Sequence, residues 1–297
     1  MRLKVFRETS TMTEKQIAWI QGRWRGDART TLDWYESTIR AHIVPNTIVI
    51  LPELVHTPYF PREESPSHFD LALDGGHPYF SKFQTLAKET ASVIVFPHFE
   101  KRAVGIYHNT VAVFDTNGAL AGTYRKSHIP DDPGFYEKFY FHPGDTGMRP
   151  INTALGRLGV LICWDQWFPE AARLMALGGA DILIYPTAIG WDSTEPEALY
   201  GAQLESWTIS MQGHAVANGI YVAAVNRLGD EGHLKFWGRS FLAGPTGSII
   251  LDSGENEGMF KATIDTAAME TQRRMWPFFR DRRIDQYEGL LKRWIDE

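Results

Sequence analysis

The chain has 297 residues, of which 43% are hydrophobic and 13% aromatic, and this composition predicts a folded protein with a large buried core rather than a disordered one. Its net charge of -6 gives no reason to expect nucleic acid or an anionic membrane as a partner. A single cysteine excludes an intrachain disulfide and cysteine-based zinc or iron–sulfur sites. The chain begins without a secretory signal and has no window of about 18 apolar residues, so we expect a cytoplasmic protein.

Strands and helices alternate along the chain after a polar N-terminal arm, residues 1–14. This alternation, with hairpins inserted, predicts a layered α/β domain. Buried strands are indicated by short β-branched and apolar runs, and helices by apolar residues at a spacing of three and four. The predicted strands are residues 16–21, 47–54, 92–97, 106–114, 119–126, 158–163, 181–186, 221–226 and 259–265, and the predicted helices are 32–43, 79–91, 169–178 and 204–217.

Three chemically active side chains, Glu53, Lys126 and Cys163, lie at or just beyond the ends of predicted strands. In open α/β sheets, ligands bind outside the carboxyl ends of the strands, so these residues are candidates for one site. A thiol at a strand-to-helix turn is a candidate nucleophile. The alternative is that Cys163 is a small buried hydrophobe, which is the usual role of a free cysteine.

A cysteine nucleophile needs a base and a group that stabilises the oxyanion. A carboxylate in a dry pocket can accept a thiol proton near neutral pH, so Glu53 is a candidate base and Lys126 a candidate oxyanion partner. Both could instead form an ordinary salt bridge or surface charges. A Cys–His pair is the rival arrangement, with the candidate histidines His128, His142 and His214. Because metal-ligand and nucleotide-binding motifs are missing, we expect no metal ion and no cofactor.

Six blocks of sequence resemble the nitrilase superfamily of carbon–nitrogen hydrolases, whose members use a Glu–Lys–Cys triad in this chain order. The resemblance implies a four-layer α-β-β-α sandwich over residues 15–268, followed by a C-terminal arm, 269–297, that contacts another subunit of a homodimer or larger oligomer. It also implies a second catalytic glutamate, Glu137, and an oxyanion contact from the backbone N–H of Trp164. The blocks are LPELVHTPYFP, FEKRAVGIYHNT, TYRKSHIPDD, LICWDQWFPEAARLMALGGADILIYPTAIGW, GHAVANGIYVAAVNRLG and FWGRSFLAGPTGSIILDSG.

Within the superfamily, CWDQWFPE and YPTAIGW are most similar to the N-carbamoylputrescine amidohydrolases, which implies the release of putrescine, carbon dioxide and ammonia. Relatives that act on carbamoyl amino acids place an arginine after the cysteine to bind a carboxylate, and this chain has none there. An acidic and aromatic surround instead favours a cationic carbamoyl substrate.

Several residues are candidates for holding that substrate. The candidates for its distal amine are Asp165, Asp192, Glu195 and Glu197, and the substrate-binding candidates are Tyr59, Asp165, Thr187, Ala188 and Glu195. Two other functions remain open: another amidase of the superfamily, acting on N-carbamoyl amino acids, β-ureidopropionate or ω-amides, and a non-catalytic binding protein with the same fold.

Overall fold

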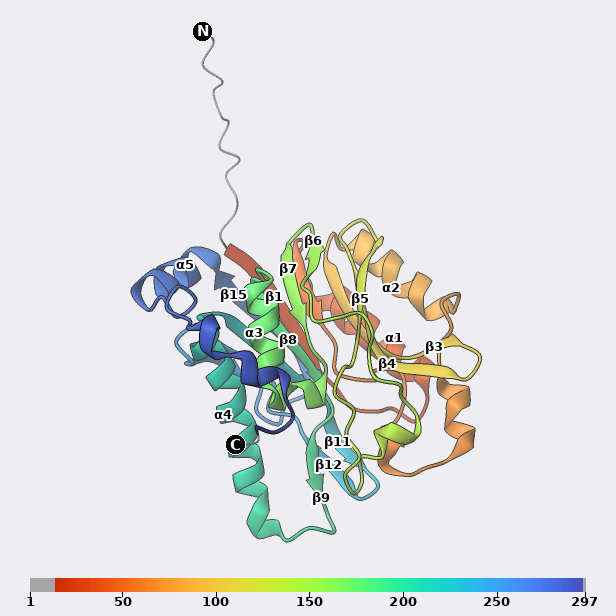
Figure 1. Cartoon of the computed structure of the whole chain (residues 1–297). Helices are drawn as coiled ribbons and strands as arrows, with labels where there is room; N and C mark the ends of the chain where they lie inside the picture. Colours follow the sequence, from red (N-terminus) through yellow and green to blue (C-terminus); the bar gives the residue numbers. More distant parts are fainter. Residues whose placement is uncertain (1–13, 296–297) are drawn as a thin grey trace.

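Two six-stranded sheets form the centre of the molecule in the computed structural model, which describes residues 14–295 (Figure 1). The first sheet has the order β15-β1-β2-β3-β4-β5, the second β14-β13-β10-β8-β7-β6, and a small third sheet β11-β12-β9. The strands of the first sheet are β1 (Glu14–Gln21), β2 (Thr47–Ile50), β3 (Val93–Ala103), β4 (Ile106–Phe114), β5 (Leu120–Arg125) and β15 (Gly258–Asp265). The second sheet contains β6 (Ile151–Thr153), β7 (Gly156–Val160), β8 (Ile182–Thr187), β10 (Tyr221–Asn226), β13 (Phe241–Ala243) and β14 (Ile249–Asp252), and the third contains β9 (Gly190–Asp192), β11 (Leu228–Glu231) and β12 (Leu234–Trp237).

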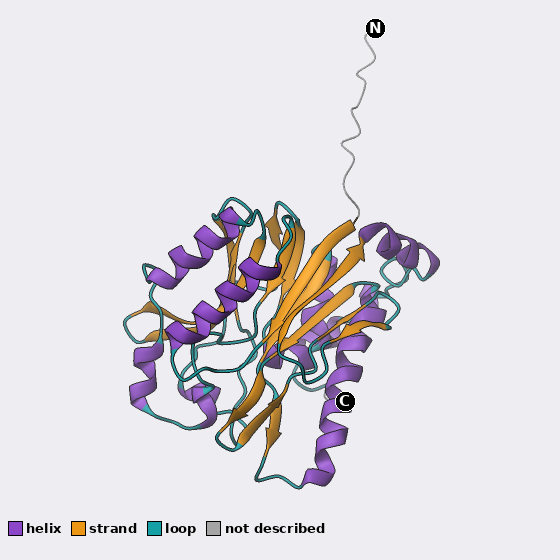
Figure 2. Ribbon diagram, turned by 180° about the vertical axis from the view of Figure 1, so that it is seen from behind, coloured by secondary structure: helices purple, strands orange, loops and turns teal. Residues whose placement is uncertain are grey.

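Helices cover the outer face of each large sheet (Figure 2). Within residues 14–295 the α-helices are α1 (Ala28–His42), α2 (Pro78–Glu89), α3 (Pro169–Leu177), α4 (Tyr200–Asn218) and α5 (Thr266–Met275). On β2, Ile48 and Ile50 face the core that the two sheets share, whereas Val49 faces a second core with Tyr35 of α1 and Phe83 of α2. Because side chains alternate along a strand, each strand of this sheet can serve both cores. The layers are therefore α-β-β-α, and the predicted four-layer sandwich is confirmed.

The predicted strands before the candidate residues are longer than the observed ones. The strand predicted over residues 47–54 ends at Ile50, and the one predicted over 158–163 ends at Val160. The chain then leaves the sheet in tight turns, in which Leu54 has φ +48° and Cys163 has φ +41°. Such backbone angles cost a non-glycine residue about 1–3 kcal/mol and are typical of functional sites.

The predicted N-terminal and C-terminal arms are described only in part. Apart from Glu14, which begins β1, the predicted polar arm over 1–14 lies outside the described residues. The predicted start of the C-terminal arm, Met269, falls inside α5. The chain beyond α5 runs back over α3 and α4 (Figure 1), where Phe279 packs against Arg173 of α3. Between residues 14 and 295, every helix is too short or too polar to cross a membrane.

Candidate active site

The segments that carry Glu53, Lys126 and Cys163 leave the two large sheets at the same end of the sandwich. Strand β5 is antiparallel to β4, and β4 is antiparallel to β3, so β5 runs in the same direction as β2. Glu53 therefore follows β2, and Lys126 follows β5, at one edge of the first sheet. Cys163 follows β7 of the second sheet, and Glu137 comes from the 3-10 helix Glu137–Phe139. Residues from both sheets thus form one cluster.

Lys126 lies between the two glutamates. Its Nζ donates to Glu53 Oε1 at 2.9 Å and to Glu137 Oε2 at 2.6 Å, and all three residues are at most 1% exposed. Burial raises the pKa of Glu137 to about 7, although Lys126 opposes this rise. Burial alone would lower the pKa of Lys126, but the carboxylates of Glu137 and Glu53 outweigh it and raise that pKa, so the ammonium stays charged.

Two further side chains hold the glutamates in place. Asn109 of β4 donates to Glu53 Oε1 at 2.7 Å, and the Tyr59 hydroxyl donates to Glu137 Oε1 at 2.8 Å. The second oxygen of Glu53, Oε2, is buried without a hydrogen-bond partner in the described part of the chain. It is therefore available to accept a proton. Sequence reasoning missed Asn109, although it lies in the block FEKRAVGIYHNT that resembles the superfamily.

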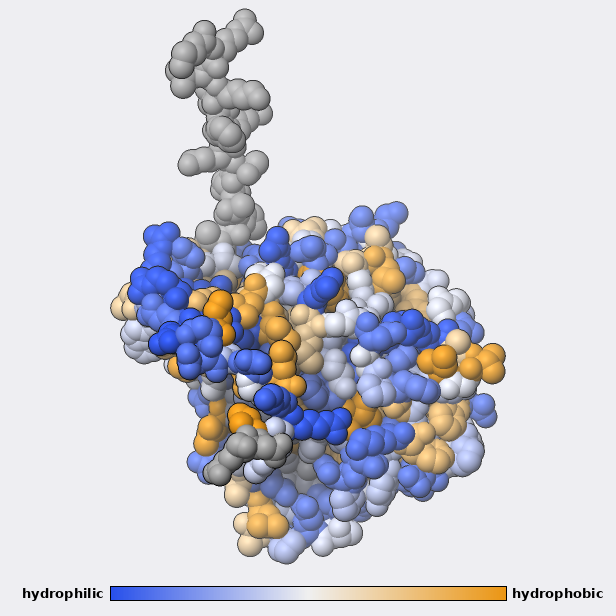
Figure 3. Space-filling model, viewed as in Figure 1, coloured by the Kyte–Doolittle hydropathy of each residue, from blue (hydrophilic) through white to orange (hydrophobic). Residues whose placement is uncertain are grey.

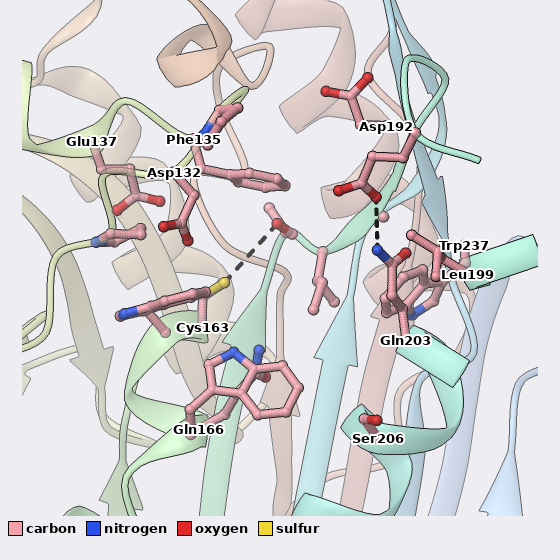
Figure 4. Close-up of a pocket in the computed structure, with 18 of the residues that line it drawn as sticks. Asp132, Phe135, Glu137, Cys163, Gln166, Asp192, Leu199, Gln203, Ser206 and Trp237 are labelled. Carbon is pink, nitrogen blue, oxygen red and sulfur yellow. Dashed lines mark hydrogen bonds between the residues drawn. The ribbon is translucent and has the colours of Figure 1, made fainter. Parts of the chain in front are cut away.

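Cys163 begins the 3-10 helix Cys163–Trp167. The residue is 6% exposed, and its Sγ lies 3.9 Å from the carbonyl oxygen of Ala188 (Figure 4). Burial and the nearby charge of Glu53 raise the pKa of the thiol, while Lys126 lowers it. A thiol in this state needs a base to become a nucleophile. The N–H of Trp164 belongs to the first turn of the helix, where backbone donors have no partner within the helix.

A cavity of about 540 Å³ opens over Cys163. In Figure 4, Asp132, Phe135 and Glu137 lie on one side of it, and Asp192, Leu199, Gln203 and Trp237 on the other. Besides Glu137, the carboxylates that line the cavity are Asp132, Asp192 and Glu195. None of the described lining residues is lysine or arginine. The cavity is therefore acidic with apolar and aromatic walls.

The structure divides the residues predicted to hold the oxyanion, the substrate or its distal amine into two groups. Trp164, Ala188, Asp192 and Glu195 line the cavity, and Glu195 Oε2 accepts a hydrogen bond from Gln203 Nε2 at 2.7 Å. The other predicted residues, which are Tyr59, Asp165, Thr187 and Glu197, are not part of the cavity lining.

Asp165 differs most from its predicted role as an amine partner. It is 0% exposed, and its carboxylate accepts hydrogen bonds from Ile162, Tyr124 and His128 on the side away from the cavity. The reason is the 3-10 helix, in which residues three apart share a face. Cys163 and Gln166 share one face of this helix, Trp164 and Trp167 share a second, and all four residues line the cavity, so Asp165 lies on the third face.

The rival Cys–His arrangement is not formed among the described residues. His128 contacts Asp165 through Nδ1 at 2.6 Å and stacks on Phe168. The carbonyl of His142 accepts from His108, and His214 Nε2 donates to the carbonyl of Gln166. Within residues 14–295, no group of three or more His, Cys, Asp or Glu side chains is placed to hold a metal ion.

Comparison with known proteins identifies the family. Residues 16–274 match the model of the carbon-nitrogen hydrolase family. The chain is 42% identical to an N-carbamoylputrescine amidase of Solanum tuberosum, over 93% of this chain and 94% of that protein. It is 38% identical to a citrullinase of Francisella tularensis, over 83% and 87% of the two chains.

A solved structure indicates the same family. The crystal structure of a carbon–nitrogen hydrolase from Helicobacter pylori superimposes with a TM-score of 0.89 at 43% identity, over 95% of this chain and 100% of that one. The family match, the sequence identities and the shared fold agree, and the resemblance stated from the sequence is confirmed. The chain belongs to the carbon–nitrogen hydrolase family.

Proposed function

We propose that this chain hydrolyses N-carbamoylputrescine to putrescine, carbon dioxide and ammonia. The carbon–nitrogen hydrolase family and the N-carbamoylputrescine amidases at 41–44% identity support this reaction type. The observation that carries the choice of substrate is the cavity, which has three carboxylates in addition to Glu137 and no lysine or arginine among its described lining residues. Such a lining favours an alkylammonium and offers no cation to a substrate carboxylate.

Cys163 is the proposed nucleophile and Glu53 the base. Glu53 takes the thiol proton, for which its unpartnered Oε2 is suited, and the thiolate attacks the carbamoyl carbon. Lys126 and the N–H of Trp164 hold the oxyanion of the tetrahedral intermediate. Glu53 then returns the proton to the departing amine. Ammonia leaves, and the putrescine carbamoyl group remains on sulfur as a thioester-like intermediate.

Water completes the reaction. Glu53 takes a proton from water, the hydroxide attacks the carbonyl carbon, and the carbon–sulfur bond breaks as Glu53 returns this proton to the sulfur of Cys163. The released carbamate loses carbon dioxide to give putrescine. In this proposal Glu137, hydrogen-bonded by Tyr59 and Lys126, keeps the ammonium of Lys126 charged and in place.

Glu195 and Asp192 are the proposed partners of the distal amine. Both line the cavity, whereas the other two candidates, Asp165 and Glu197, do not. Gln203 donates to Glu195 and so fixes its carboxylate. Trp237 lines the same side of the cavity (Figure 4) and adds an aromatic wall for the alkyl chain. An aliphatic chain that ends in an ammonium group matches this combination.

The test is ammonia release from a panel of substrates: N-carbamoylputrescine, citrulline, N-carbamoyl-β-alanine, an N-carbamoyl-D-amino acid and a neutral ω-amide. We expect the highest kcat/KM for N-carbamoylputrescine, and a loss of at least roughly a hundredfold when a carboxylate replaces the ammonium. A preference for citrulline or another carboxylate-bearing substrate would contradict the proposal. Binding of the substrate without any turnover would favour the non-catalytic alternative.

We also propose that the chain forms a homodimer or larger homo-oligomer in the cytoplasm. Large apolar side chains are exposed on α3, α4 and the C-terminal segment, including Leu174, Ile209, Leu291 at 91% and Trp294 at 79%. Figure 3 shows apolar side chains gathered on this face. Exposed apolar patches of this kind mark subunit contacts, and a reactive free thiol favours a reducing compartment. Light scattering of the purified protein should give at least twice the chain mass, and a monomer would contradict the assembly proposal.

A further inference from the structure

The carboxylate of Asp165 receives four hydrogen bonds from two separate parts of the chain. Oδ1 accepts from the backbone N–H of His128 at 3.0 Å and pairs with His128 Nδ1 at 2.6 Å. Oδ2 accepts from the backbone N–H of Ile162 at 3.0 Å and from the Tyr124 hydroxyl at 2.8 Å. Because the residue is 0% exposed, water cannot replace these donors.

The two parts of the chain that Asp165 joins carry two of the proposed catalytic groups. Tyr124 and His128 lie on either side of Lys126, which follows β5 of the first sheet. Ile162 immediately precedes Cys163, whose strained backbone has φ +41°. Backbone strain at such a turn persists only when the surrounding contacts enforce it. Asp165 supplies such a contact directly before the strained residue.

We propose that Asp165 is a positioning residue that fixes Cys163 relative to Lys126, and this rests on the function proposed above. Its hydrogen bonds connect the end of the second sheet to the end of the first. At this point the thiol of Cys163 and the ammonium of Lys126 must both reach the carbonyl group of the substrate. Asp165 acts through the backbone and touches no substrate, because it is not part of the cavity lining. Displacement of a reacting group by about 1 Å costs roughly a hundredfold in rate, so this contact has a measurable catalytic effect.

Asparagine cannot take over this role, although it has the same shape. Each oxygen of Asp165 accepts one backbone N–H, from His128 or from Ile162. A backbone N–H cannot reverse its direction. Whichever way the amide of Asp165→Asn is turned, its NH₂ group faces one of these donors. One of the two parts of the chain must therefore move away.

The test compares Asp165→Asn with Asp181→Asn in the full-length protein. Asp181 also accepts a backbone N–H, from Arg157 at 2.9 Å, and a side-chain donor, from Lys15 at 2.6 Å. It precedes β8, whose other end reaches the cavity at Ala188, so a strand of about 20 Å separates the control from the site. The measurements are kcat and KM for N-carbamoylputrescine, and the rate at which iodoacetamide alkylates Cys163.

For Asp165→Asn we expect kcat to fall roughly a hundredfold with KM changed less than about threefold, and alkylation of Cys163 to slow roughly tenfold. For Asp181→Asn both kcat and the alkylation rate should match those of the wild type. A kcat for Asp165→Asn within about threefold of the wild type, or a loss confined to KM, would overturn the proposal.

A milder variant keeps the test decisive if Asp165→Asn does not fold. Tyr124→Phe removes one donor and leaves three, and it should lower kcat roughly five- to tenfold at unchanged KM; an unchanged kcat would overturn the proposal. If the wild type does not hydrolyse N-carbamoylputrescine at all, the proposed function fails. The alkylation rates of the same variants then still decide whether Asp165 positions Cys163.

Discussion

Replacing Lys126 by methionine should destabilise the protein far more than an equivalent change at its surface. The substitution keeps most of the aliphatic stem and removes a cation that lies 2.9 Å and 2.6 Å from two carboxylate oxygens. These carboxylates, on Glu53 and Glu137, are both 0% exposed. Removing one partner of a buried ion pair costs about 3–5 kcal/mol, because an uncompensated buried charge remains.

Lys15→Met is the matched control. Lys15 Nζ lies 2.6 Å from Asp181 Oδ2, but the side chains of this pair are 18% and 24% exposed. Water can therefore replace the lost contact, and the expected cost is about 0–1 kcal/mol. Lys126→Met loses two short ion-pair contacts and Lys15→Met loses one. The difference between the variants therefore measures the combined effect of burial and of the second carboxylate.

The cost of Lys126→Met should also depend on pH. Burial already raises the pKa of Glu137 from 4.5 to about 7 while Lys126 opposes the rise, so removing the lysine raises it further. When the pKa of a carboxyl is higher in the folded than in the unfolded protein, the carboxyl is neutral in the folded protein at low pH. The folded protein then loses stability as the pH rises through the pKa of the folded state. The variant should therefore lose more stability at pH 8 than at pH 5.

Urea unfolding followed by tryptophan fluorescence at pH 5 and pH 8 measures both effects. We expect a larger loss of unfolding free energy for Lys126→Met than for Lys15→Met, and a loss that grows with pH only for Lys126→Met. Equal losses for the two variants, or a loss at Lys126 that does not change with pH, would refute the reasoning. For Lys126→Met, kcat should also fall roughly 10²- to 10³-fold, because the substitution removes a proposed oxyanion partner.

Three further predictions concern Glu195 and Glu137 of the site, and Glu231, which accepts a hydrogen bond from the backbone N–H of Tyr59 at 2.6 Å. Glu195→Gln should raise KM for N-carbamoylputrescine about tenfold and leave kinetics on a neutral ω-amide unchanged; an equal effect on both substrates would remove Glu195 from the amine pocket. Glu231→Gln removes the negative charge that pairs with buried Arg227 at 2.7 Å and should lower the unfolding free energy by about 3 kcal/mol, which chemical denaturation measures; a loss below about 1 kcal/mol would contradict it. Glu137→Gln removes a carboxyl with a pKa near 7, so its melting temperature should improve relative to the wild type as the pH rises from 5 to 8, and parallel curves would contradict that prediction.

The alternation of strands and helices predicted a layered α/β domain and the residues at the strand ends, whereas the four-layer sandwich was implied by the resemblance to the nitrilase superfamily. Strand and helix periods are local signals, and the strand ends that carry Glu53, Lys126 and Cys163 follow from them. The same signals overestimated the strands before Glu53 and Cys163, because apolar residues continue past the last paired residue into buried turns. An apolar run indicates burial, and it does not distinguish a paired strand from a turn packed against the core.

The walls of the cavity could not be predicted in the same way. Asp132, Gln203 and Trp237 come from segments far apart in the sequence, and only the packing of the layers brings them together. Asp165 was misassigned to the amine because it is adjacent to the nucleophile in sequence. Its side chain points away because the turn is a 3-10 helix, where Gln166 and not Asp165 shares a face with Cys163.

Mass spectrometry of the protein quenched during turnover of N-carbamoylputrescine shows whether Cys163 is the nucleophile. We expect a covalent adduct, equal in mass to the substrate minus ammonia, on the peptide that contains Cys163. We also expect that Cys163→Ala gives neither adduct nor ammonia release, while its unfolding curve stays close to that of the wild type. Ammonia release by Cys163→Ala, or an adduct on any other residue, would contradict the proposed mechanism.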